Sequence, residues 1–167
     1  MDNLTLIRKV FEAHRKVSQN IKLVGDSVND MEAIFSLQGI YSGLTQSSAT
    51  AVAERQKKLQ QVVSFLDEGL KTHFGFEIKY LPPLLGEWLS RALAIEHQLI
   101  LNDINQTKIL LADINSEGLK QEQLLAYKSQ LQQAVSDLGQ VIQEHMSNEE
   151  TVLRMIQKAL EEEKTAT

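Results

Sequence analysis

The sequence predicts an all-α protein, an up-down-up-down antiparallel four-helix bundle, and three observations lead to this prediction. Apolar residues recur at alternating steps of four and three positions, which is the period of helices packed side by side. The only two prolines are adjacent, at Pro82 and Pro83, and few other breakers interrupt the pattern. Leu, Gln, Glu, Ala and Lys, all good helix formers, are frequent. Long helices joined by short connections fold most simply as an antiparallel bundle.

The breaks in the apolar pattern divide the chain into four segments. The first break runs from Gly39 to Gly43, the second is the proline pair, and the third ends at Gly118. We therefore expect helices over residues 3–38, 47–81, 84–114 and 118–163. No linker or internal repeat separates them, so residues 1–167 form one predicted domain.

Composition excludes several classes of function. The chain has no cysteine, which rules out disulfides, zinc–thiolate sites, iron–sulfur clusters and a thiol nucleophile. Its formal net charge is −5 and its Lys and Arg residues are not clustered, so a nucleic-acid partner is not expected. No apolar run is long enough for a membrane span, and no secretory signal is apparent. These features predict a cytoplasmic protein without membrane or nucleic-acid partners.

Each of the four apolar seams is interrupted by one of the only four histidines, His14, His73, His97 and His145. In an antiparallel hairpin, two residues at the same height lie equally far from the turn. The midpoints of successive histidine pairs fall at about residues 43–44, 85 and 121, each beside a predicted turn, and a three-residue offset is less than one helical turn. The four histidines should therefore lie at one level of the bundle.

Two of the histidines are followed four residues later by a glutamate, as His73–Glu77 and His145–Glu149. Residues at i and i+4 share one helical face, so both side chains can reach the same ion or pair of ions. Burying two carboxylates and four imidazoles without a Lys or Arg partner would be costly. A pair of metal ions removes this cost, and nitrogen and oxygen donors suit iron or manganese. We therefore predict a metal site whose ligands are His14, His73, Glu77, His97, His145 and Glu149.

The order H…HxxxE…H…HxxxE resembles that of the hemerythrin-like cation-binding domains. The resemblance covers essentially the whole chain, through EAH at His14, LKTHFGFEIKYLPPL at His73, IEHQ at His97 and EHMSNEETVL at His145. It implies a non-haem centre of two iron ions with an oxo or hydroxo bridge, held by the six predicted ligands. Manganese is the second choice of metal.

The chain departs from the oxygen-carrying hemerythrins in two places. Leu101 stands where those proteins have a second histidine one turn after His97, and HxxxE replaces their H-x4-D, with Glu150 at the x4 position. This ligand set is closer to that of di-iron proteins of iron–sulfur repair and nitric-oxide stress, although their cysteine-containing N-terminal domain is missing here. Glu150 is an alternative to Glu149, and Glu96 is an alternative ligand or a group that supports one. Tyr80 could hydrogen-bond a ligand, donate an electron or pack at the bundle end.

Three functions are compatible with such a centre. The leading hypothesis is binding or sensing of a small diatomic ligand, oxygen or nitric oxide, or of peroxide. The second is a di-iron oxidoreductase acting on peroxide or nitric oxide, or an iron donor for cluster repair; the third is an iron-responsive interaction module. We expect no enzyme activity under the leading hypothesis. Both a monomer and a homodimer remain open, because the sequence shows no stripe that demands a partner.

Overall fold

A computed structural model shows four long helices packed side by side, which confirms the predicted all-α four-helix bundle. It describes residues 1–40, 46–112 and 121–165, without the side chains of residues 32, 34–40, 46–49 and 121–125. The helices are α1 (Asn3–Ile40), α2 (Gln46–Tyr80), α3 (Pro82–Ala112) and α4 (Gln121–Thr165). None of them, over the described residues, combines the length and the apolar character that crossing a membrane requires.

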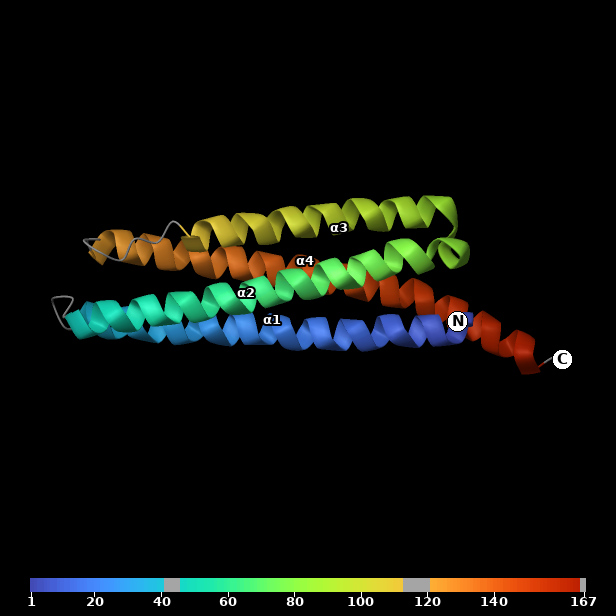
Figure 1. Cartoon of the computed structure of the whole chain (residues 1–167), viewed down its shortest axis with the longest axis horizontal. Helices are drawn as coiled ribbons and strands as arrows, with labels where there is room; N and C mark the ends of the chain where they lie inside the picture. The colour runs from blue at the N-terminus through green and yellow to red at the C-terminus, as the bar shows by residue number, and fades with distance from the viewer. Residues whose placement is uncertain (41–45, 113–120, 166–167) are drawn as a thin grey trace.

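The contacts between neighbouring helices run in opposite directions along each pair. From α1 to α2, His14 contacts His73, whereas Asp30, further along α1, is paired with the earlier Lys58. Likewise Glu77 of α2 lies beside His97 of α3, and the earlier Asp67 beside the later Lys108. Figure 1 shows each helix returning along the one before it.

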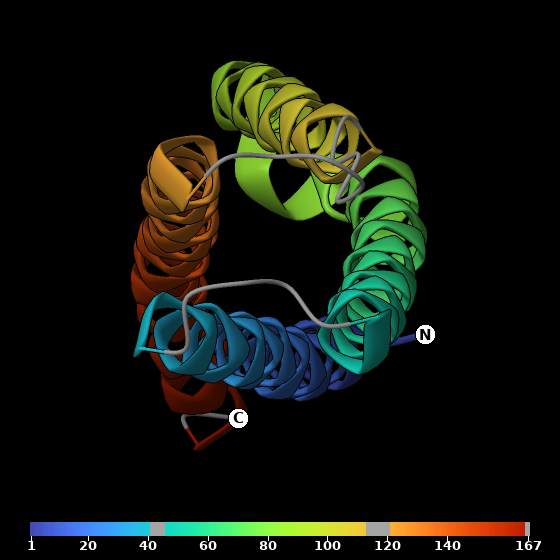
Figure 2. The same ribbon diagram turned by 90° about the vertical axis from the view of Figure 1, so that its left-hand side faces the viewer.

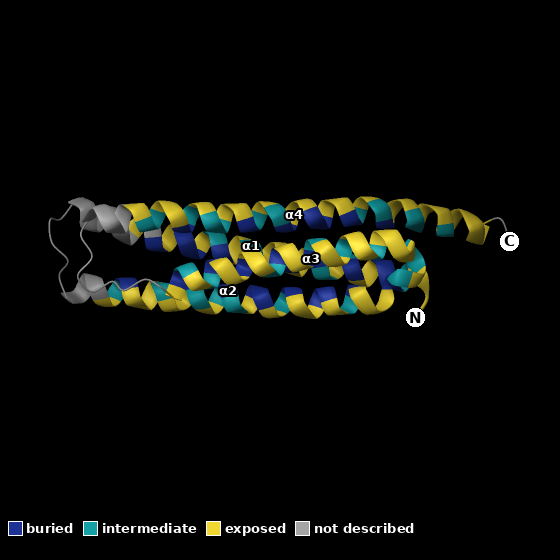
Figure 3. Ribbon diagram, turned by 90° about the horizontal axis from the view of Figure 1, so that it is seen from above, coloured by how far each residue is buried: buried dark blue, intermediate teal, exposed yellow. Residues whose placement is uncertain are grey.

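The helices form a closed ring around a common axis. Each helix packs against the two next to it, α1 with α2 and α4, and α3 with α2 and α4 (Figure 2). One side of each helix is therefore buried and the opposite side is exposed, as Figure 3 shows. This pattern explains the steps of four and three in the sequence, because those positions are the ones that face the axis.

Two apolar clusters fill the interior, one above and one below a polar layer. The larger cluster includes Val17, Leu70, Ile100 and Ile142 and extends toward the α1–α2 connection. The smaller cluster lies at the other end and consists of Leu6, Ile7, Val10, Leu81 and Leu153. The six predicted metal ligands fall between the clusters in every helix, for example His14 between Val10 and Val17. The polar layer is thus sealed on both sides by apolar packing.

The connection between α2 and α3 is shorter than the sequence predicted. Only Leu81 lies between the two helices, and both prolines belong to the first turn of α3 rather than to a loop. Proline is well suited to this position because the first amide groups of a helix have no partner within the helix. Gly86 then interrupts the helical conformation with φ of 74° and ψ of 175°. The predicted α2 and α3 boundaries, 81 and 84, were therefore each off by one or two residues.

The other predicted helix boundaries lie within two residues of the observed ones wherever the structure describes them. The first helix extends to Ile40 instead of residue 38, so Gly39 lies inside it. The predicted end of the third helix at residue 114 and the start of the fourth at residue 118 lie outside the described residues.

Asp2 caps α1, because its carboxylate accepts hydrogen bonds from the Thr5 amide and hydroxyl, both at 2.9 Å.

A buried carboxylate that the sequence analysis did not single out ties α2 to α3. Asp67 is 2% exposed, and its Oδ2 accepts from Lys71 at 2.8 Å and from Lys108 at 2.9 Å. These two ammonium groups lower the pKa of Asp67, although burial alone would raise it. The charge of Asp67 is thus compensated by two lysines. Among the described residues, no lysine or arginine compensates the six residues of the polar layer in this way.

Replacing Gly86 should destabilise the fold, whereas the same change in a regular helix should stabilise it. A Cβ at Gly86 meets nothing within 4 Å, so the cost of Gly86→Ala comes from its backbone conformation alone and should be about 1–3 kcal/mol. Gly25→Ala, in helical conformation and also with free space, should gain about 0.5–1 kcal/mol. Urea unfolding followed by circular dichroism measures both changes; equal effects for the two variants would contradict the strain at Gly86.

Candidate metal centre

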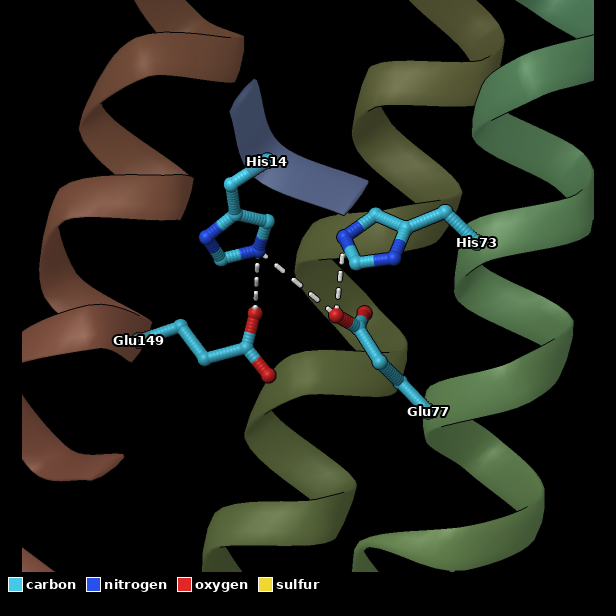
Figure 4. A group of neighbouring side chains, drawn as sticks. All are labelled: His14, His73, Glu77 and Glu149. Carbon is cyan, nitrogen blue, oxygen red and sulfur yellow. Dashed lines mark hydrogen bonds and ion pairs between the residues drawn. The ribbon is translucent and has the colours of Figure 1, made fainter. Parts of the chain in front are cut away.

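The six residues predicted as metal ligands lie together in one buried layer near the α2–α3 connection. Each helix supplies at least one of them, and all six are 5% exposed or less. They are His14 of α1, His73 and Glu77 of α2, His97 of α3, and His145 and Glu149 of α4. Figure 4 shows four of them, His14, His73, Glu77 and Glu149, with their polar ends directed toward one another.

Their donor atoms form two groups, and Glu77 belongs to both. In the first group, one donor atom each of His14, His73, Glu77 and Glu149 lies within 4.8 Å of the others. Glu77, His97 and His145 form the second group by the same measure. The two oxygens of Glu77 are divided between them: Oε1 lies 2.8 Å from Nε2 of His73, and Oε2 lies 3.1 Å from Nε2 of His97.

Several of these buried donor atoms lack a hydrogen bond. Among the described residues, no hydrogen-bond partner exists for both ring nitrogens of His73 and of His97, both oxygens of Glu77, Nε2 of His145 and Oε1 of Glu149. Nε2 of His73 and Oε1 of Glu77 lie only 2.8 Å apart, yet the pair does not have the geometry of a hydrogen bond. Unpaired buried polar groups cost on the order of 1–3 kcal/mol each. Metal ions would satisfy the atoms that face the layer, which include Nε2 of His73 and of His97, but not the Nδ1 atoms of these two rings. The six residues fit a metal site.

The two buried carboxylates of the layer require positive charge nearby, and His14 supplies part of it in the absence of a metal ion. Burial alone would lower the pKa of His14, but its contacts with Glu149, at 3.1 Å, and with Glu77, at 3.7 Å, raise it to about 9. Burial would raise the pKa of Glu77, yet the three neighbouring imidazoles hold it well below its usual range. Burial, together with the charge of Glu77, raises the pKa of Glu149. A proton on His14 therefore sits beside the two carboxylates that a metal ion would neutralise.

Two further carboxylates orient the histidines from outside the layer. Glu150 Oε1 accepts from Nδ1 of His14 at 3.1 Å, and Glu96 Oε2 accepts from Nδ1 of His145 at 2.7 Å. In each ring the other nitrogen, Nε2, is left facing the layer, which is the usual arrangement at metal sites. Glu150 is also held by Arg154 at 2.8 Å. The structure thus places Glu149 inside the layer and Glu150 and Glu96 behind the histidines.

Phe74 is a part of the site that the sequence analysis missed. It is 2% exposed, stacks on His97 with ring centroids 3.9 Å apart, and meets the edge of His145 at 5.6 Å. Its position directly after His73 gave only a weak indication that it belongs to the site, because Phe74 lies one residue away from the predicted apolar seam. The ring fixes the orientation of two histidines and excludes water from their side of the layer.

Two other aromatic residues lie away from the layer. Tyr80 is 40% exposed and packs on Phe76, with ring centroids 4.9 Å apart, near Lys79. No contact joins it to the six residues within the described part of the chain. Trp88, just after the α2–α3 connection, is 77% exposed.

Cavities reach residues of the layer between several pairs of helices. A groove of about 680 Å³ between α1 and α2 extends to His73. A smaller cavity of about 110 Å³ between α3 and α4 reaches Glu149 and Glu96, and its other walls are mostly aliphatic: Leu85, Leu89, Ala92, Leu93 and Val152. The smaller cavity has the size and lining suited to a small uncharged molecule.

The raised pKa of His14 makes the stability of the metal-free protein depend on pH. A pKa raised from 6.5 to about 9 means that the folded chain holds a proton that the unfolded chain releases earlier. The resulting stabilisation is fully present below pH 6.5 and is lost as the pH rises to about 9. Chelator-treated protein should therefore unfold at lower urea concentration at pH 9 than at pH 6.5, and His14→Gln should show a smaller decrease. An equal decrease in the variant would contradict the role of His14.

Comparisons of the chain with family models, with curated proteins and with solved structures found no match. The relation to hemerythrin-like domains therefore stays an expectation that depends on the four histidine motifs.

Proposed function

We propose that this protein holds two iron ions in the polar layer and binds or senses a small ligand there, oxygen in the first place. The observation that carries the proposal is the position of Glu77, whose two oxygens face two different groups of histidines. A carboxylate placed in this way can bridge two ions. Each ion would then have two imidazoles, His14 and His73 for one, and His97 and His145 for the other.

The donor types support iron over softer or harder metals. Four imidazole nitrogens and two carboxylates suit iron, with manganese as the second choice, while the absence of thiolates disfavours copper(I) and structural zinc. Glu150 and Glu96 increase the basicity of His14 and His145, which strengthens both as ligands. A reduced iron pair would supply the electrons and the open coordination needed to bind oxygen or nitric oxide.

The two groups differ in a way that leaves room for such a ligand. Glu149 belongs to the first group, and its Oε2 is 4.0 Å from Nε2 of His145 in the second. The second ion would therefore have fewer protein donors than the first. The aliphatic cavity between α3 and α4 ends at Glu149 of the first group, and Glu96, which accepts a hydrogen bond from His145 of the second group, also lines it. Its lining offers no charged anchor for a larger substrate apart from the two glutamates.

Metal content should follow the division into two groups. Anaerobic loading with Fe²⁺ should give about two ions per chain in the wild type, since each group offers at least three donors. His97→Ala should lower the content toward one ion, because it removes a donor of the second group only, and Glu77→Ala should weaken both. Mass spectrometry of the metals after desalting measures these contents.

Asp67→Asn is the matched control for metal content. It also alters a buried carboxylate of α2, but one that is paired with lysines outside the layer. It should keep about two ions per chain. A wild type that takes up no iron, or one whose uptake is insensitive to Glu77→Ala, would contradict the proposed centre.

The visible spectrum tests the ligand. Reduced, iron-loaded protein exposed to air should develop a charge-transfer band that disappears when oxygen is removed. Val152→Phe should fill the aliphatic cavity and slow this change by about tenfold, equivalent to about 1.4 kcal/mol in the barrier, without changing the iron content. Met155→Phe, at a 70% exposed position on the same helix, is the control.

Other outcomes identify the alternative functions. Irreversible oxidation with repeated turnover of peroxide or nitric oxide would replace the binding function by an oxidoreductase. Loss of helicity on iron removal without any adduct would favour an iron-responsive interaction module.

A further inference from the structure

The outer face of α3 carries a continuous stripe of exposed side chains. Among the large apolar residues that are exposed on the described helices, five belong to α3, whereas those on the other helices are scattered. Trp88 is 77% exposed, and Ile95, Leu99 and Ile109 are each more than half exposed. Exposed apolar residues that gather on one face indicate an interaction surface.

The stripe follows the spacing of a coiled coil. Its steps alternate between four and three over three heptads, in the order Trp88, Ala92, Ile95, Leu99, Asn102, Gln106 and Ile109. This face points away from the core, since His97, Ile100 and Ile104 of the same helix are buried on the opposite side. Such spacing suits another helix packed lengthwise over roughly 30 Å.

The charges beside the stripe indicate the partner and its direction. Arg91 and Glu96 lie on opposite flanks of the stripe and are five residues apart, the spacing at which flanking residues pair between two parallel helices. Glu96 can pair in this way through Oε1, because its Oε2 is bonded to His145 and its side chain is still 44% exposed. The next pair at this spacing, Gln98 and Asp103, carries no like charges. In an antiparallel pair, Glu96 would instead lie near Asp103 of the other helix, which is repulsive. The stripe is therefore self-complementary in the parallel arrangement.

We propose that this face binds a second copy of the chain, forming a homodimer in which the two α3 helices pack in parallel about a two-fold axis. Ala92 faces Ala92 of the second copy near the middle of the stripe's apolar half, where its small side chain allows the helices to approach closely. Asn102 and Gln106 make the other half polar, so the contact is modest in energy. One helix pair is also smaller than a typical stable interface. The dimer thus dissociates on dilution.

The full chain in solution tests the oligomeric state. Sedimentation velocity should show a dimer at concentrations on the order of tens of micromolar, which corresponds to a modest contact. Leu99→Glu should give a monomer with unchanged helicity, and Met155→Glu, an equally drastic change at an exposed site of α4, should leave the dimer intact. Arg91→Glu should weaken the dimer, since it would face Glu96 of the second copy. A wild type that stays monomeric at several hundred micromolar, whether or not it binds lipid vesicles or another protein, would overturn the proposal.

Single cysteines determine the direction of pairing, because the natural chain has none. In the parallel dimer, Ala92→Cys and Gln106→Cys should each cross-link to themselves under mild oxidation, and Met155→Cys should not. In an antiparallel dimer centred on the stripe, residue 92 would lie beside residue 106 of the other copy. Cross-linking only in a mixture of Ala92→Cys and Gln106→Cys chains would therefore overturn the parallel arrangement, and a dimer that cross-links at neither position would place the interface elsewhere.

Discussion

The constraint on which this bundle depends is the cost of placing six ionisable side chains in one buried layer. The free energy of unfolding of a domain is only about 5–15 kcal/mol, and a few uncompensated buried polar groups could consume it. Asp67 shows the ordinary solution, in which two lysines reach one buried carboxylate. In the described part of the chain, no lysine or arginine reaches the polar layer in this way, and a proton on His14 compensates its carboxylates only in part. The apolar clusters above and below must therefore stabilise a layer that is unfavourable until it gains cations.

The position of the layer follows from features that can be read in the sequence. A short connection fixes the height of one helix against the next, so His97 of α3 meets Glu77 of α2 once the turn at Pro82 is located. The i, i+4 spacing then places Glu77 and Glu149 on the same faces as His73 and His145. These relations depend only on helical geometry, and for that reason the four-helix bundle and the gathering of all six residues could be predicted.

Other features of the site and of the surface could not be predicted, because they depend on side-chain positions that the apolar periodicity does not determine. Glu96 and Glu150 lie next to layer residues in the sequence, yet their role depends on which ring nitrogen they reach across the bundle. Phe74 lies one residue away from the predicted seam, and it packs inward within the larger apolar cluster and against the rings of His97 and His145. The exposed stripe on α3 was overlooked for a related reason. Apolar residues on two faces of one helix resemble a single broad core face until the neighbouring helices are in place.

The shared carboxylate of Glu77 has a thermodynamic consequence. Two ions that used separate ligands would load independently, each with its own affinity. Here the first ion would orient the Glu77 carboxylate and displace the proton from His14, and the second ion would find one of its ligands already ordered. Repulsion between the cations acts against this gain and is reduced by the negative charge that lies between them. In such a centre, occupancy of the two positions would be coupled, and the chain would respond to metal availability more steeply than a single site would.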